Sequence, residues 1–399
     1  REKQPAVKKV IELSALVMVR YGEIALKGKN RGQFEQQLHR NLKDAVKDLS
    51  GKVERMHGRF MVSGPDSNLE HMLDRLSRVF GIVSVSPVTE VPLDINAIKQ
   101  AAIGAVGKRR GNKNSFKIAA RRANKNFPYE SPELNRVLGE CLLEAYPYLT
   151  VSLREPDFAL AVEIGYSNAY IYLEQIPGPG GLPLGITGRS LLLLSGGIDS
   201  PAAGWLAMKR GLNLEALHFH SFPFTSTRSR EKVIELSRKL AVYGRKIPLH
   251  MISVTEIQKE LRSKCPDELG VILLRRIMLR LAERLSEKRG ITSLITGENL
   301  GQVASQTLES IAVVSKATGL LILRPLIGFD KGEIIEIARK IDTYDTSILP
   351  YQDCCTVFVP KSPVTKPKIA VVERYEENLE MEKLLSDAFS TLETEVVRR

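Results

Sequence analysis

A short polar loop between a buried strand and a helix contains residue types that bind phosphate. Residues Ser195–Ser200 read Ser-Gly-Gly-Ile-Asp-Ser, and they follow four leucines that predict a strand buried on both faces. Pro201 comes next, in a position typical of the first turn of a helix. Paired glycines let a ligand approach the backbone, hydroxyls donate to phosphate oxygens, and a helix start offers free N–H groups. We therefore expect an anion at this loop.

The loop is not that of the common P-loop enzymes. The chain has no Gly-x-x-x-x-Gly-Lys-Ser/Thr segment, which disfavours a P-loop kinase or GTPase. The pattern Ser-Gly-Gly-x-Asp-Ser instead resembles the PP-loop of the ATP pyrophosphatases, which split ATP between its α and β phosphates and attach AMP to a substrate oxygen. That resemblance implies that the loop holds pyrophosphate and that Asp199 contacts Mg²⁺. The alternative is a serine-rich turn with no ligand.

The elements around this loop predict a parallel, doubly wound sheet. From Ser190 to about Asp342, apolar strands alternate with helices, which is typical of such α/β folds. Their ligands bind at the carboxyl ends of the strands. The segments expected at that edge are Ser195–Ser200, His218–His220 and Gly297–Gln302. We expect the histidines to line the pocket and the last, Gly-rich segment to hold an adenine or ribose edge. The tail from Val371 predicts an amphipathic packing helix.

The first half of the chain predicts two smaller units. Residues 13–88 alternate strand, helix, strand, helix and strand, which is typical of an α+β ferredoxin-like fold. A loop rich in Lys and Arg within it predicts either an RNA contact or a solvated connection. A second α/β unit follows, and a Gly- and Pro-rich segment then marks a boundary. The predicted domains are 1–75, 76–175 and 189–399, with a linker at 176–188.

A cationic stretch, residues 108–127, lies in the second unit. It holds eight Lys and Arg residues and no Asp or Glu. Its strand and loop are expected to follow a phosphate backbone, with Phe116, Phe127 and Tyr129 offering planar rings to unstacked bases. A solvated surface is the alternative. The candidate RNA-binding residues are Lys108, Arg109, Arg110, Lys113, Lys117, Arg121, Arg122 and Lys125.

Composition favours a globular protein with a polyanionic partner. The chain has 399 residues and a net charge of +12, with 43% apolar residues. That charge suits nucleic acid, but it also suits solubility or the surface of a thermophile's protein. No apolar run approaches the ~18 residues of a membrane span, and no signal peptide is expected, so the predicted location is cytoplasmic. Four cysteines without Cys-x-x-Cys spacing suggest neither structural zinc nor a disulfide scaffold.

Four segments together resemble the ThiI family of tRNA 4-thiouridine synthetases. They read RYGEIALKGKNRGQFE from Arg20, SGGIDSPAAGWLAMKRG from Ser195, TGENLGQVASQTLES from Thr296 and LILRPLIGFDKGEII from Leu321. The resemblance implies a ferredoxin-like domain, a THUMP domain that binds the acceptor end of tRNA, and a PP-loop domain. The implied reaction makes 4-thiouridine at position eight of tRNA, by adenylating uridine O4 and replacing it with sulfur.

The resemblance also implies ligands, partners and site residues. ATP and Mg²⁺ are the implied cofactors, and a cysteine desulfurase supplies persulfide sulfur. A small sulfur-carrier protein, a role in thiamine thiazole synthesis and a homodimer stay open. The chain ends before the rhodanese domain of some members, which leaves the delivery of sulfur open. The implied ATP contacts are Leu193, Leu194, Ser195, Gly196, Gly197, Asp199, Ser200, His218, Phe219, Arg275, Gly297 and Gln306.

Adjacent cysteines in the segment Asp353-Cys354-Cys355 are the candidates for sulfur transfer. Prolines bound this segment, which predicts a loop near the strand ends, and nearby lysines favour a thiolate. The resemblance puts a catalytic cysteine in this segment: matching forward from LILRPLI favours Cys354, and matching back from Lys361-Ser362-Pro363 favours Cys355. We expect Cys354 to accept sulfur or resolve a persulfide, with Cys355 as its disulfide partner. Cys141 and Cys265 are expected bystanders. The alternative is a pair of buried structural thiols.

Other functions fit the residues less well. An ATP-dependent amidotransferase or small-molecule ligase shares the loop but has no use for a basic RNA-binding half. A nonenzymatic RNA-binding protein would not need the intact loop at 195–200. A THUMP-type methyltransferase would need a glycine-rich loop for its methyl donor, and the sequence shows none.

Overall fold

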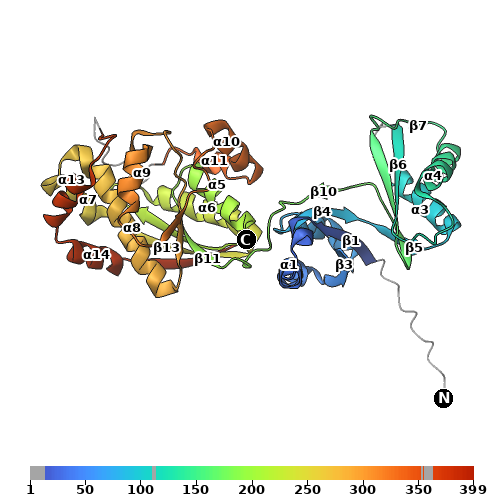
Figure 1. Ribbon diagram of the computed structural model, residues 1–399, viewed down its shortest axis with the longest axis horizontal. Coiled ribbons are helices and arrows are strands. Elements are labelled where there is room, and N and C mark those ends of the chain that lie inside the picture. The colour runs from blue at the N-terminus through green and yellow to red at the C-terminus, as the bar shows by residue number, and fades with distance from the viewer. Residues whose placement is uncertain (1–13, 110–113, 352–353, 355–362) are drawn as a thin grey trace, which may run out of the picture. The chain divides into compact units, whose positions relative to one another are not determined.

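The computed structural model describes residues 14–109, 114–351, 354 and 363–399. The chain divides into two compact units, one ending at Gly180 and the other beginning at Gly181 (Figure 1). Among the described residues, no helix combines the length and the apolar character needed to cross a membrane. The first unit holds two five-stranded sheets and the second holds one six-stranded sheet.

The first sheet has the order β10-β4-β1-β3-β2 and is antiparallel throughout. Alternate side chains of the central strand β1 point to one face, where they pack with α1 and α2 to form a core. Its elements are β1 (Ser14–Tyr21), α1 (Arg31–Val46), β2 (Lys52–Met56), β3 (Arg59–Pro65), α2 (Leu69–Leu76), β4 (Ile82–Pro87) and β10 (Ile176–Pro177).

Two strands of this sheet come from later in the chain than the first predicted domain. Its strand β4 lies after residue 75, and β10 comes from the segment predicted as a linker. Ile176 pairs with Val85, and Gln175 Nε2 donates to Ser84 Oγ at 3.0 Å. The edge of β4 therefore gains a backbone partner, which satisfies hydrogen-bonding groups that a mobile linker would leave open.

The second sheet has the order β5-β9-β8-β6-β7, with α3 and α4 packed against one face. Asp94 caps α3 by accepting a hydrogen bond from Ala97 N, as expected for an Asp before a helix. Its elements are β5 (Thr89–Pro92), α3 (Ile95–Gly107), β6 (Ser115–Arg122), α4 (Ser131–Ala145), β7 (Thr150–Val151), β8 (Phe158–Ile164) and β9 (Asn168–Tyr172).

The sheet of the second unit has the order β15-β14-β11-β12-β13-β16, and its first five strands are parallel. The strands are β11 (Arg189–Leu193), β12 (Asn213–His220), β13 (Lys246–Ser253), β14 (Ser293–Ile295), β15 (Leu321–Leu323) and β16 (Glu393–Arg398). The helices are α5 (Asp199–Lys209), α6 (Thr227–Gly244), α7 (Thr255–Lys264), α8 (Gly270–Arg289), α9 (Leu308–Ser315), α10 (Lys331–Lys340), α11 (Tyr344–Ser347), α13 (Ile369–Glu377) and α14 (Met381–Ser390). The predicted parallel, doubly wound sheet is confirmed.

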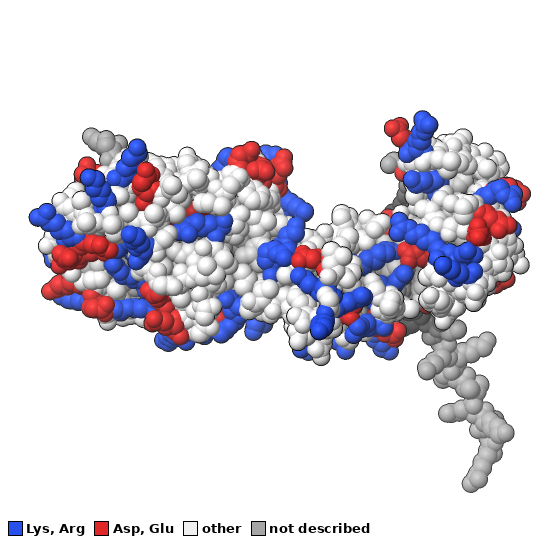
Figure 2. Space-filling model, viewed as in Figure 1, with Lys and Arg blue, Asp and Glu red and all other residues white. Residues whose placement is uncertain are grey.

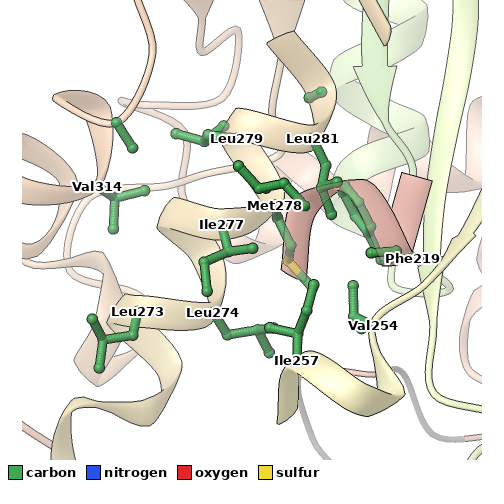
Figure 3. Packing of buried hydrophobic residues seen from close by; sticks show 14 of the residues in the cluster. Phe219, Val254, Ile257, Leu273, Leu274, Ile277, Met278, Leu279, Leu281 and Val314 are labelled. Atoms are coloured by element: carbon green, nitrogen blue, oxygen red, sulfur yellow. The ribbon is translucent and has the colours of Figure 1, made fainter. Parts of the chain in front are cut away.

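Helices cover both faces of this sheet. Helices α5 and α6 contact each other and strands β11 to β13, while α8 contacts α7, α9, α13 and α14 on the other side. Figure 3 shows the core on the α8 side, where Leu273, Ile277 and Met278 of α8 lie among side chains such as Phe219 and Val254. Adjacent leucines of β11 serve opposite faces, which explains why this strand is apolar without alternation.

The tail differs from the single helix predicted from Val371. It forms two helices, α13 and α14, and then the strand β16, which pairs antiparallel with β13. Val397 is buried opposite Ile247, and the neighbouring Val396 is exposed. The apolar–polar alternation of these last residues is short and directly follows an acidic helical pattern, so the sequence does not indicate a strand. The strand forms because the tertiary fold places these residues beside β13.

Candidate functional site

The loop Ser195–Ser200 connects β11 to α5, as the sequence predicts. Ser200 Oγ accepts from Ser195 N at 2.9 Å and lies 3.0 Å from Ser195 Oγ, which in turn accepts from Gly197 N at 3.2 Å. Ser200 is buried. These hydrogen bonds close the loop on itself, so that its shape is set by its own hydroxyls. The Ser200 hydroxyl therefore braces the loop in addition to any contact with phosphate.

Gly297 lies against this loop, just after β14. A Cβ at this position would stand 2.8 Å from Ser200 N and 2.9 Å from the carbonyl carbon of Asp199. Side chains do not tolerate such distances to backbone atoms, so the position requires glycine. The backbone that approaches Gly297 is the start of α5. Strand β14 thus supports the helix end that faces the expected phosphate.

Asp199 is held between two side chains from the neighbouring strand ends. Lys331 Nζ, in the first turn of α10, lies 2.6 Å from Asp199 Oδ1, and Gln302 Nε2 donates to Oδ2 at 3.0 Å. Asp199 and Lys331 both remain partly exposed. No group of three or more His, Cys, Asp or Glu residues suited to a metal occurs among the described residues. A single carboxylate fits Mg²⁺ when phosphate oxygens and water complete the coordination.

A buried carboxylate ties together the turn that follows β14. Glu298 is 3% exposed and pairs with Arg275 at 2.6 Å and Arg324 at 2.7 Å, while Thr296 Oγ1 donates to it at 3.0 Å. Burial alone would raise the pKa of Glu298, but the two guanidinium charges and the hydrogen bonds outweigh it and hold the pKa below its ordinary value. Arg275 also donates to Ser305 O at 3.0 Å. Arg275 therefore anchors this turn with part of its charge already offset.

The residues around the strand ends complete the expected ATP pocket. His218 Nδ1 lies 2.9 Å from Leu194 O, which joins β12 to the end of β11. Leu194 and Phe219 are buried, and only Leu193 of this group is half-buried. The Gln306 Oε1 atom is buried without a hydrogen-bond partner among the described residues. Such an acceptor suits a ligand donor such as an amino group.

The structure therefore brings the predicted ATP residues to one strand-end edge, through contacts that link the loop, Gly297, Arg275 and the turn before Gln306. Sequence reasoning missed Lys331, Arg324 and the charge of Glu298. The sequence does contain a hint of both, because Glu298 directly follows Gly297 and Lys331 begins the helix after β15. Neither residue, however, is part of a recognisable motif.

Cys354 is buried, at 5% exposure, within the core formed with α7 and α8. Its carbonyl oxygen accepts from Gln258 Nε2 at 2.8 Å. Its neighbours Asp353 and Cys355 lie outside the described residues. Cys141 and Cys265 are partly buried, and burial raises the pKa of both thiols, which disfavours a reactive thiolate at either.

The cationic stretch divides into structural and exposed side chains. Arg122 donates to the carbonyls of Phe127 and Tyr129 at 3.0 and 3.3 Å, and Arg109 stacks on the ring of Phe158 at 3.6 Å. Lys108, Arg121 and Lys125 are exposed, Lys117 is half-buried, and Arg110 and Lys113 lie outside the described residues. Figure 2 shows Lys and Arg interspersed with Asp and Glu over both units.

Two of the three rings predicted to stack on bases are buried, and the third, Tyr129, is half-buried. Phe116 and Phe127 are 1% and 5% exposed and belong to the core of the second sheet. The alternation of β6 turns Phe116 and Ile118 inward and leaves Lys117 on the opposite side. The basic loop of the first sheet is also partly structural, because Arg20 pairs with Glu163 and Arg31 with Glu35, whereas Lys29 is exposed.

Three family models match successive parts of the chain. A ThiI ferredoxin-like domain matches residues 16–86, a THUMP domain matches 93–174, and the model described as thiamine biosynthesis protein (ThiI) matches 185–381. The chain is 52% identical over 94% of its length to a probable tRNA sulfurtransferase of Moorella thermoacetica, and 47% identical over 96% to one of Brevibacillus brevis. Each match covers 96% of the relative.

A solved structure agrees with these relatives. The crystal structure of a 4-thiouridine synthetase–RNA complex with bound ATP superposes with a TM-score of 0.88 at 40% identity, covering 96% of this chain and all of that one. The order of the three matched domains is the order of the three sheets described above. The chain belongs to the ThiI family.

Proposed function

We propose that the protein is an ATP-dependent tRNA sulfurtransferase that converts uridine at position eight of tRNA to 4-thiouridine. The observation that carries this proposal is the loop at 195–200, closed by its own serines, supported by Gly297 and ending in Asp199. Relatives that share about half of its residues over nearly the whole chain are probable tRNA sulfurtransferases, which supports the same reaction.

Binding of ATP follows from the geometry of the strand ends. The loop amides and the start of α5 face the phosphates, and Leu193, Leu194, His218 and Phe219 form the wall along β11 and β12. The uncompensated Gln306 Oε1 accepts from the base. Arg275 acts mainly by holding the turn that carries Gln306, since its guanidinium bonds Ser305 O and Glu298.

Activation of uridine requires the loop to accept a growing negative charge. Uridine O4 attacks the α-phosphorus and pyrophosphate leaves, so that O4 becomes part of an AMP leaving group. Asp199 would hold a Mg²⁺ ion, which would supply charge neutralisation for the departing pyrophosphate. Lys331 Nζ lies 2.6 Å from Asp199 at the same loop, and its side chain is partly exposed, so we expect it to turn toward the phosphates when Mg²⁺ and ATP compete for that carboxylate.

Sulfur enters in the second half of the reaction. A sulfur nucleophile adds to C4 and AMP departs with the original O4. We propose that one of Cys354 and Cys355 carries the sulfur as a persulfide received from a cysteine desulfurase, and that its terminal sulfur adds to C4 as AMP departs. The other thiol then attacks the inner sulfur, which releases 4-thiouridine and leaves a Cys354–Cys355 disulfide that an external thiol reductant reopens. Cys354 is buried, so its thiol must become accessible before it meets the donor. This reaction is compatible with a small sulfur-carrier protein as a further partner and with a role in thiamine thiazole synthesis. It is also compatible with a homodimer.

Single Cys→Ser variants test the covalent carrier. Cys354→Ser or Cys355→Ser should abolish 4-thiouridine formation from a desulfurase donor, and each should retain ATP and tRNA binding. Cys265→Ser serves as a matched control, because burial disfavours a thiolate at Cys265. Full activity of both the Cys354 and Cys355 variants would favour direct attack by free sulfide.

Binding of tRNA is proposed for the first unit. The exposed Lys108, Arg121 and Lys125 and the half-buried Lys117 supply phosphate contacts, and the THUMP match supports recognition of the tRNA acceptor end. The proposed domains are the ferredoxin-like and THUMP domains of this unit and the PP-loop domain of the other, with a cytoplasmic location.

Incubation with ATP, sulfide and unmodified tRNA tests the reaction. The expected result is 4-thiouridine in the RNA together with AMP and pyrophosphate. AMP formation without thiolated RNA would favour an ATP-dependent amidotransferase or a small-molecule ligase instead.

A further inference from the structure

A loop after β12 exposes two phenylalanine rings at the edge where the ATP residues gather. This aromatic loop, residues 221–226, reads Ser-Phe-Pro-Phe-Thr-Ser and leads into α6. Phe222 is 59% exposed and Phe224 is 49% exposed, whereas Phe219 in the adjoining strand is 6% exposed. Two large apolar side chains that are exposed within three residues of each other offer a surface on which a ligand could pack.

Hydrogen bonds made by buried residues fix the backbone of the aromatic loop, which carries the exposed rings. Thr225 N donates to Ser221 O at 3.0 Å, and Ser221 N donates to Thr225 Oγ1 at 3.2 Å. Thr255 Oγ1, from the start of α7, donates to Phe222 O at 2.8 Å. Ser221 and Thr225 are both buried. A rigid aromatic surface binds a planar partner with little loss of conformational entropy.

Hydrogen bonds connect the surroundings of the aromatic loop both to the strand end before residues 195–200, the nucleotide loop, and to Cys354. On one side, His218 bonds Leu194 O, and Phe222 is only four residues further along, which limits the Cα separation of His218 and Phe222 to about 14 Å. On the other side, Ser221 Oγ donates to Gln258, whose amide donates to Cys354 O at 2.8 Å. Activated phosphate and the sulfur-bearing segment would both be close to a group seated on the rings.

Two arginines follow the aromatic loop at the start of α6. Arg228 and Arg230 lie in the first turns of α6 and are exposed, and Arg228 stands 5.9 Å from the centre of the Tyr351 ring. Arg230 pairs with Glu393 at 2.7 Å. Aromatic rings beside arginines are the combination that binds unstacked bases and their phosphates, whereas an apolar peptide would gain nothing from the positive charge.

We propose that Phe222 and Phe224 form a stacking platform that holds the target uracil out of the tRNA stack while its O4 faces the nucleotide loop. This inference rests on the proposed function. Chemistry at O4 and C4 of a base needs the base to leave its stack, and the exposed rings replace the lost stacking. The platform is a positioning site for the substrate, distinct from the phosphate contacts of the first unit.

Turnover with free sulfide tests the platform. The Phe222→Ala/Phe224→Ala double variant should lower kcat/KM for tRNA by roughly ten- to a hundredfold, the range expected when base stacking is lost. ATP affinity and total tRNA affinity should stay within about twofold of wild type, because the phosphate contacts are elsewhere. Tyr at both positions should restore most of the activity. Val371→Ala, which truncates an exposed apolar residue of α13, is the matched control and should have no effect.

Crosslinking supplies a readout that does not depend on turnover. Transfer RNA carrying 4-thiouridine at the target position should crosslink under near-ultraviolet light to a peptide containing residues 221–226, and the double alanine variant should lose that product. An active double variant with unchanged kcat/KM, or a crosslink only to other segments, overturns the platform.

Two further outcomes separate the alternatives. If the double variant is slow only with desulfurase-delivered sulfur and normal with free sulfide, the aromatic loop docks the donor protein and the base-stacking proposal is wrong. If wild-type protein makes no 4-thiouridine from ATP, sulfide and tRNA, the proposed function fails and this inference falls with it.

Discussion

The nucleotide loop and the cationic stretch were both predicted from short runs of residues. The side chains of the loop make the local contacts expected from their spacing, whereas those of the cationic stretch are divided between internal contacts and solvent. In the loop at 195–200 each serine makes the close backbone contacts that its spacing suggests. In the cationic stretch, Arg109 and Arg122 are used within the domain, while Arg121 and Lys125 are left exposed. A motif with fixed spacing specifies a backbone shape, whereas a run of charge specifies only composition. The direction of each cationic side chain depends on the strand that carries it.

Asp199→Ala should have the largest effect. Removing the carboxylate removes the partner of Lys331 and the expected Mg²⁺ contact, so AMP formation should fall by at least about a hundredfold. Binding of tRNA should stay within a few-fold, because the cationic stretch lies in the other unit. Pyrophosphate release and filter binding measure the two quantities. An equal loss of AMP formation and of tRNA binding would contradict the assignment of these two functions to separate units.

Glu298→Gln should mainly affect stability. The substitution leaves Arg275 and Arg324 without a buried anion, which we expect to lower the free energy of unfolding by about 3 kcal/mol near neutral pH. The folded-state pKa of Glu298 is lowered, so its stabilisation is present above the unfolded-state pKa of ~4.3 and is lost as pH falls through the folded-state value. The difference between wild type and variant should therefore shrink below about pH 4 in denaturant titrations. If the difference in the free energy of unfolding between wild type and Glu298→Gln is the same at every pH, the substitution acts through packing and not through the charge of Glu298.

Gly297→Ala should disturb the loop from behind. A methyl group 2.8 Å from Ser200 N forces the start of α5 to shift, at about 1–3 kcal/mol, and should weaken ATP binding. Gly270→Ala is the matched control, since Gly270 begins α8 and a methyl group there would meet no atom within 4 Å. Calorimetric titration with ATP measures the effect. Normal ATP affinity in Gly297→Ala would show that the loop does not depend on β14.

Arg121→Ala and Arg122→Ala should distinguish an exposed cationic side chain from one that is bonded within its domain. Arg121 is exposed, so its loss should lower the log–log salt slope of tRNA binding by about 0.9 with unchanged stability. Arg122 bonds two carbonyls, so its loss should lower the free energy of unfolding by about 1–3 kcal/mol. Binding at several salt concentrations and thermal melts measure both. An unchanged slope for Arg121→Ala would make that side chain an ordinary solvated residue.

Much of the nucleotide site could be predicted because its residues follow strands directly. The loop and Gly297 sit at turns whose place is set by the apolar strands before them. The contact of Lys331 with Asp199 joins residues 132 positions apart, and no local pattern announces it. The role of Glu298 depends on its contacts with Arg275 and Arg324, which lie more than twenty residues away on either side, and no local pattern indicates them.

The RNA face was predicted less well for a physical reason. Phe116 and Phe127 were assigned to the surface because they are interleaved with cations, but strand alternation sends Phe116 inward and the turn after β6 buries Phe127. The strand β16 was missed because its partner β13 lies more than a hundred residues earlier. Pairing of this kind is decided by tertiary contact and not by local propensity.

We expect one molecule of ATP to be cleaved at the loop of the second unit for each uridine thiolated on a tRNA bound by the first. The most direct test is a single-turnover reaction with sulfide, in which AMP and 4-thiouridine are counted in the same quenched sample. We expect equal amounts of AMP and 4-thiouridine, and no AMP when cytidine, which lacks O4, replaces the target uridine. AMP formed at the same rate on the cytidine-substituted tRNA would contradict this expectation.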